Sequence, residues 1–167
     1  MRSTVVLALA LVALGCAARA ALPPGAAPAL RLSELARQGD APRRASLRLI
    51  LEGLEAEQAG AESRAVVLYE RALGLDATNP FAYLALARHY AALEDGSRTL
   101  EYLEQSEVLL RSEGGYDPRL EAHLVGLRGQ ALCSAGRGEE GRVLLEQARR
   151  LAPAEWADGE LGAAELR

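Results

Sequence analysis

A repeat of 34 residues is the feature that most limits how this chain can fold. A triplet of a small, a large and a small residue occurs three times. The second triplet begins 34 residues after the first, and the third begins 42 residues after the second, which leaves eight inserted residues. The three triplets are Ala65, Tyr69 and Ala72; Thr99, Leu103 and Ser106; and Gly141, Leu145 and Ala148. Two helical stretches within each period predict stacked helix pairs, because a single pair cannot bury its own apolar face.

The composition agrees with a purely helical fold. Half of the residues are hydrophobic, mostly Ala and Leu, whereas aromatic residues make up 4% and Ile occurs once. The chain therefore lacks the β-branched and aromatic residues that are typical of strands. Residues 16–167 carry 18 Arg against 23 acidic residues, a net charge of about −5. This mild acidity argues against nucleic acid as the main partner.

The second copy carries the most complete pattern. It reads Tyr83-x-x-Leu86-Ala87-x-x-Tyr90 and continues with the second triplet. Over residues 46 to about 155 the sequence resembles the tetratricopeptide repeat family. The resemblance implies an all-α, right-handed α-solenoid of about three helix pairs, within a domain of residues 30–167. The expected repeats are 46–79, 80–113 and 122–155, with an insertion at 111–118. A helix over Leu30 to Gln38 would cap the front of the stack, and residues 156–167 would cap the rear.

The resemblance also implies a place for a partner. Tetratricopeptide domains generally bind extended peptides or partner helices on the concave face, which the first helix of each pair lines. The positions that match this face are Leu47, Ile50 and Leu54; Phe81, Leu84 and Arg88; and His123, Gly126 and Gln130. The basic and Asn clamp that the family uses for carboxylates has no counterpart there, so an apolar or helical ligand is expected. Alternatively, the protein's own N-terminal helix covers Leu47, Ile50 and Leu54.

The N-terminus predicts export. Arg2 precedes an apolar run from Val5 to Cys16, which is too short to span a bilayer that needs roughly 20 residues. Ala13-Leu14-Gly15-Cys16 resembles a bacterial lipobox. Residues 1–15 are therefore expected to be a signal peptide, Cys16 to carry lipid, and residues 16–29 to form an Ala/Pro tether. Alternatively, cleavage after Ala20, in the A-x-A segment Ala18-Arg19-Ala20, would release a soluble periplasmic adaptor.

These features together predict a lipid-anchored interaction module of the cell envelope. Lipidation would place the domain on a membrane. The resemblance to bacterial lipoproteins further implies the outer membrane, facing the periplasm, because the residue after Cys16 is Ala17 and not Asp. The expected function is that of a scaffold or adaptor, and the expected partner is a protein or peptide of the envelope. A ligand carrier or an accessory subunit of an enzyme is a less favoured alternative.

The sequence contains no arrangement of residues that predicts catalysis. Cys133 lies in a helical stretch, where a buried thiol is the ordinary interpretation, and the available bases are His89 and His123. No Cys, His or Asp cluster has the spacing of a metal site, and Gly114-Gly115 lacks the Lys-Ser/Thr of a phosphate loop. We therefore expect no enzyme activity, no cofactor and no metal. Tyr116 in the insertion is a further candidate partner contact, although neutral variation in loop length is the favoured interpretation of the insertion.

Overall fold

The computed structural model describes residues 28–114 and 117–167. Several sequence predictions lie outside these residues, namely the signal peptide, lipidation at Cys16, cleavage after Ala20 and a partner contact by Tyr116. In the described part of the chain, the regular elements are all helices, and no helix there is both long and apolar enough to cross a membrane.

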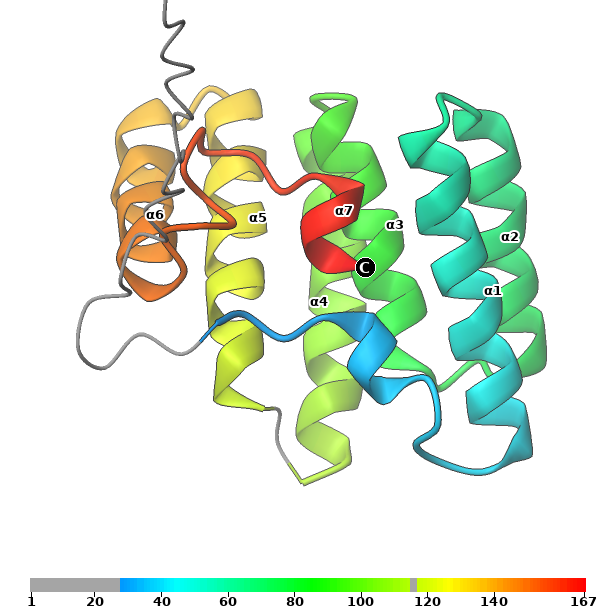
Figure 1. Ribbon diagram of the computed structural model, residues 1–167. Coiled ribbons are helices and arrows are strands. Elements are labelled where there is room, and N and C mark those ends of the chain that lie inside the picture. The colour runs from blue at the N-terminus through cyan, green and yellow to red at the C-terminus, as the bar shows by residue number, and fades with distance from the viewer. Residues whose placement is uncertain (1–27, 115–116) are drawn as a thin grey trace, which may run out of the picture.

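Three antiparallel helix pairs stand side by side and form the body of the molecule (Figure 1). The first pair is α1 (Ala41–Gln58) with α2 (Glu62–Leu75), and the second is α3 (Pro80–Ala92) with α4 (Gly96–Ser112). The third pair is α5 (Glu121–Ser134) with α6 (Gly138–Leu151), and the 3-10 turn η2 (Pro118–Leu120) precedes it. The predicted all-α solenoid of three helix pairs is confirmed, although α1 begins at Ala41, ahead of the expected start of the first repeat.

Short polar residues determine where three of these helices begin. Asp40, Asn79 and Asp95 precede α1, α3 and α4, and the side-chain oxygen of each accepts a hydrogen bond from a backbone N–H of the first turn. These N-caps satisfy backbone donors that have no partner within the helix. Pro42 and Pro80 follow two of the caps in the first turn, where a missing N–H costs nothing.

The turn between the two helices of each pair needs a residue in the left-handed conformation. Gly60 and Gly136 fill this place in the first and third pairs, with φ angles of 74° and 79°. The second pair has Glu94 there, with a φ of 57°. Glycine adopts this conformation without steric cost, whereas a residue with a Cβ does not.

Small residues allow the two helices of a pair to approach closely, as the repeat pattern predicts. A Cβ placed on Gly53 of α1 would lie 2.3 Å from the Cε1 atom of Tyr69 on α2. A Cβ on Gly129 of α5 would lie 2.9 Å from the Gly141 carbonyl oxygen on α6. Both distances are shorter than any real contact, so the helix spacing depends on these glycines.

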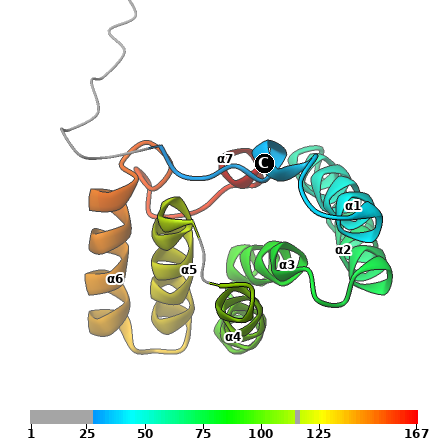
Figure 2. The ribbon, with the colours of Figure 1, turned by 90° about the horizontal axis from the view of Figure 1, so that it is seen from below.

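The two terminal segments cross the face made by the first helices of the pairs (Figures 1 and 2). The N-terminal strap, residues 28–39, contains the 3-10 turn η1 (Leu32–Leu35), and the C-terminal segment, residues 152–167, contains the short helix α7 (Ala163–Leu166). They meet where the Ser33 N–H donates to the Arg167 carbonyl, at 2.8 Å. The helix predicted over Leu30 to Gln38 is thus a single 3-10 turn, because so short a stretch gains little from helix formation while its leucines gain from burial.

Candidate partner-binding face

The concave face is formed by α1, α3 and α5, and the solenoid curves around it (Figure 2). The structure brings the predicted partner residues to these three helices, but it buries most of them. Of the eight non-glycine positions, six are less than 7% exposed, and only Phe81 and Gln130 are half-buried. The buried six are Leu47, Ile50, Leu54, Leu84, Arg88 and His123.

The N-terminal strap covers part of this face. Leu30, Leu32 and Leu35 are 1%, 0% and 9% exposed, and they belong to the same apolar core as Leu47 and Ile50 of α1. The side chains of Arg31, Ser33 and Glu34 between them face solvent. The sequence left open whether the chain's own N-terminal segment covers α1, and the structure has the strap packed there.

His123 of α5 fixes the strap through its backbone. The side chain is fully buried, and its Nε2 lies 3.1 Å from the Leu30 carbonyl oxygen. Burial lowers the pKa of His123 to about 4, so the imidazole is neutral at ordinary pH. Because the carbonyl can only accept, Nε2–H is the donor, and the buried Nδ1 has no partner.

The C-terminal segment covers another part of the face. Trp156 is fully buried, and its indole ring lies against Gly126 of α5, where a Cβ would approach the ring to 2.3 Å. Leu166 of α7 is also fully buried, and Arg167 forms an ion pair with Glu55 of α1. The segment thus connects the third helix pair to the first across the concave face.

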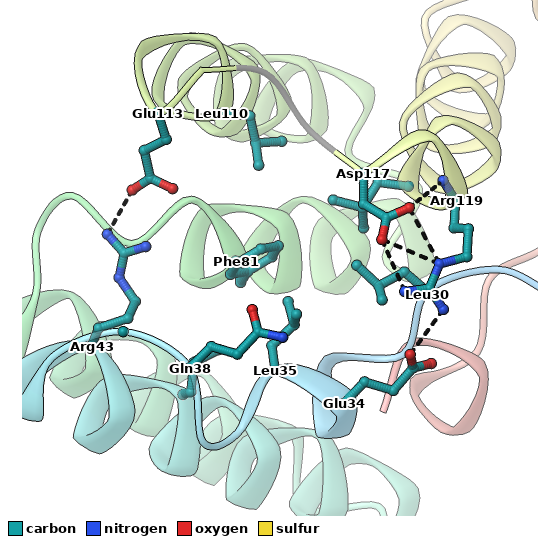
Figure 3. A pocket seen from close by; sticks show the side chains of 13 residues that line it. Leu30, Glu34, Leu35, Gln38, Arg43, Phe81, Leu110, Glu113, Asp117 and Arg119 are labelled. Carbon is teal, nitrogen blue, oxygen red and sulfur yellow. Dashed lines mark hydrogen bonds and ion pairs between the residues drawn. The ribbon is translucent and has the colours of Figure 1, made fainter.

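A cleft with a volume of about 470 Å³ opens on this face (Figure 3). It lies between the strap, the start of α3 and the end of α4. Apolar side chains from these three elements, from α1 and from η2 line it, namely Leu30, Leu35, Leu47, Phe81, Leu110 and Leu120.

The N-cap of α3 positions Phe81 in this cleft. The Asn79 side-chain oxygen accepts a hydrogen bond from the Phe81 N–H at 3.1 Å, and the Asn79 amide donates to the Ser46 hydroxyl at 2.9 Å. Asn79 and Ser46 are both fully buried. The cap therefore ties the start of α3 to α1 and fixes where the aromatic ring of Phe81 lies.

Two arginines border the cleft, and each is already paired with acidic residues. Arg43 forms ion pairs with Asp76 and, at 2.8 Å, with Glu113. On the other side, Arg119 is bound by Asp117 at 2.9 Å and by Glu34 of the strap at 2.8 Å. Hydrogen bonding from Arg119 lowers the pKa of the Asp117 and Glu34 carboxyls below their usual range. The carboxylates at the border outnumber the two arginines, so the border disfavours an acidic anchor, and the apolar floor is the selective part of the cleft.

A buried polar cluster on the same face has no counterpart in the sequence predictions. The carboxylate of Glu57 on α1 binds Arg88 and His89 of α3 and accepts a hydrogen bond from the Tyr69 hydroxyl of α2 at 2.9 Å. Burial, together with the Glu57 carboxylate, raises the pKa of Tyr69 well above its usual value. Charged groups in such a place are tolerated because they are paired. This cluster could have been predicted from the sequence, because an acidic and a basic residue lie about one repeat apart on the first helices of neighbouring pairs.

The same cluster borders a smaller cavity of about 280 Å³ next to Gly162 and Glu165. The Glu57 carboxylate of this cluster already binds three side chains, so the cluster joins the first two helix pairs and presents no free acid or base. Across the described residues, no group of three or more His, Cys, Asp or Glu side chains could hold a metal ion. Cys133 is a free, half-buried thiol.

Comparison with known proteins identifies the fold. No family model and no curated protein matches the chain. Among solved structures, it is similar to the N-terminal domain of stress-induced protein-1 (STI-1) from C. elegans, at 19% sequence identity and a TM-score of 0.57. The match covers 77% of this chain and 98% of that domain. At this identity the likeness shows the fold alone, which is a tetratricopeptide-like helical solenoid.

Proposed function

We propose that this protein is a lipid-anchored protein-interaction module of the cell envelope, and that its partner docks in the open cleft on the concave face. The cleft carries the proposal, because its apolar floor stays partly open at the half-buried Phe81, whereas most of the other predicted partner positions are buried. Apolar side chains that enter such pockets usually contribute most of the binding energy of an interface. Because both arginines at the border are paired with an excess of carboxylates, an uncharged apolar anchor is favoured over an acidic one.

The membrane attachment rests on the N-terminal sequence. Gly15-Cys16 follows an apolar run of the length of a signal-peptide core, and lipid on Cys16 would hold the domain at a membrane. Acylation of the native protein is tested by its intact mass and by partitioning into detergent. We expect a diacylated or triacylated chain beginning at Cys16, and we expect Cys16→Ser to move the protein to the soluble fraction. A water-soluble chain beginning at Ala21 would instead favour the soluble periplasmic adaptor.

A photo-crosslinking residue tests the docking site. We would place p-benzoylphenylalanine at Phe81 and, as a control, at Val67 of α2, which is 52% exposed. Irradiation of intact cells should crosslink one envelope protein from position 81 and not from position 67. Equal yields of the same product from both positions would exclude the cleft as the docking site.

A further inference from the structure

We propose that the N-terminal strap is a built-in ligand of the concave face, and that the partner is a leucine-bearing peptide that replaces it and forms the same short 3-10 turn. This inference rests on the proposed interaction function and names the chemistry of the partner. The strap itself shows what the face accepts, because residues 30–35 cross it much as a bound peptide would.

The side chains of the strap divide into a buried and an exposed set. Leu30, Leu32 and Leu35 are at most 9% exposed, whereas the residues between them face solvent. The face therefore selects three apolar side chains with one residue between the first two and two residues between the last two. The exposed positions place no demand on the partner's sequence, except where Glu34 binds Arg119.

The backbone of the strap is bound by groups of the solenoid and of the C-terminal segment. The Leu30 N–H donates to the Arg119 carbonyl at 3.3 Å, and the Leu30 carbonyl accepts from His123 at 3.1 Å. Farther along, the Ser33 N–H donates to the Arg167 carbonyl at 2.8 Å. Main-chain hydrogen bonds of this kind give affinity to any peptide that adopts the backbone of the strap, while the side-chain pockets give specificity. The partner is thus expected to carry the pattern Leu-x-Leu-x-acid-Leu.

The strap is the exchangeable one of the two terminal segments. The C-terminal segment anchors the fully buried Trp156 and Leu166, and it supplies the Arg167 carbonyl that binds the strap, so it forms part of the binding face. The largest side chains that the strap buries are leucines. Its ion pair is partly exposed, with 44% of the Glu34 side chain accessible. The open cleft lies beside Glu34 and Leu35, which gives an incoming peptide its first contact (Figure 3).

A labelled peptide with the sequence of residues 28–36 (PALRLSELA) tests this proposal on the purified mature protein. In wild type the strap competes with the peptide, so binding should be weak. Glu34→Arg in the protein places like charges together at Arg119 and loosens the strap, and it should strengthen peptide binding at least about ten-fold. Glu104→Arg makes the same charge change at an exposed position on α4, and it should leave peptide binding as in wild type.

A charge exchange locates the bound peptide. Arg119→Glu should reverse the preference, so that a peptide with Glu34→Arg binds at least about ten-fold more tightly than the original peptide. Circular dichroism confirms that each variant keeps its helices. Equal peptide binding by wild type and Glu34→Arg, or no reversal with Arg119→Glu, would overturn the proposal. A wild-type dimer that the peptide cannot compete away would also overturn it, because a second copy would then be the occupant.

The two proposals can fail separately. Crosslinking from position 81 without any effect of Glu34→Arg on peptide binding would leave the interaction function standing and remove the strap as its ligand mimic. Peptide binding with the expected charge reversal, but no crosslinked envelope protein, would keep the strap as an exchangeable ligand of the face. It would count against the cleft as the docking site of an envelope protein.

Discussion

At the scale of single residues, His123 has the clearest energetic consequence. Its ring is buried and neutral, and it donates to the strap at Leu30. Burial lowers the pKa of His123 to about 4, below the 6.5 expected in the unfolded chain. Between these two values the unfolded state binds a proton that the folded state does not, so the free energy of unfolding falls as the pH falls. The total loss is about 3 kcal/mol, and it is absent above pH 6.5.

His123→Gln tests this contribution, because glutamine can donate to the same carbonyl and does not titrate. Urea unfolding of the two proteins should give similar pH profiles above pH 7. By pH 5 the wild type should have lost about 2 kcal/mol more than the variant. Parallel profiles down to pH 4.5 would show that His123 does not resist protonation in the folded protein.

At the scale of helices and turns, the second pair contains the least favourable turn. Glu94 adopts a φ of 57° at the place where the other two pairs have glycine. Glu94→Gly should therefore raise the free energy of unfolding by about 0.5–1 kcal/mol, since relief of the left-handed strain exceeds the entropy cost of glycine. Chemical denaturation measures the change.

The reciprocal substitution in the first pair provides the control. Gly60→Glu should destabilise by about 1 kcal/mol, because it introduces the same strain where no Cβ contact interferes. If both substitutions change stability in the same direction, the three turns are not equivalent.

The helix pairs could be predicted from the sequence because their packing is local. Small residues such as Gly53 and Gly129 recur where two helices of one pair touch, and this regularity is visible without any knowledge of distant contacts. The covering of the concave face could not be predicted in the same way. Leu47, Ile50 and Leu54 have the same apolar character whether a partner or the chain's own strap lies on them. The partner of His123 is a backbone carbonyl, and because every residue has one, the sequence does not identify it.

Burial also changes how the predicted site can be studied. Ile50 and Leu84 are fully buried, so a charged substitution at either would unfold the protein rather than report on binding. Phe81 is half-buried at the open cleft, and Glu34 and Arg119 are partly exposed. These three positions can be changed with the fold intact.

At the scale of the whole molecule, the terminal segments make a short solenoid cooperative. Repeat arrays generally unfold in parts, because each repeat contacts only its neighbours. Here the C-terminal segment packs Trp156 on α5 and pairs Arg167 with α1, so the first and third helix pairs are joined directly. We expect the fluorescence of Trp156, the only tryptophan, and the far-ultraviolet circular dichroism to report one midpoint of denaturation.

Gly126→Ala should separate the two midpoints. The added methyl group displaces the indole ring, at a cost of roughly 1–3 kcal/mol, and the fluorescence transition should then precede the loss of helix. Gly74→Ala is the matched control, because a Cβ at that helical position meets no atom within 4 Å. It should stabilise α2 by about 0.5–1 kcal/mol and leave the two midpoints together. Coincident transitions in both variants would show that the seating of Trp156 does not couple the repeats.

The course of the strap has a mechanical consequence. A pull applied ahead of residue 28 reaches the bonds at Leu30 first and the Ser33–Arg167 bond afterwards, because these contacts follow one another along the chain. They break singly, so the strap would peel at low force while the three helix pairs, which share larger packed surfaces, stay folded. If Cys16 carries lipid as proposed, tension on that anchor would uncover the part of the concave face under the strap without any change in ligand concentration.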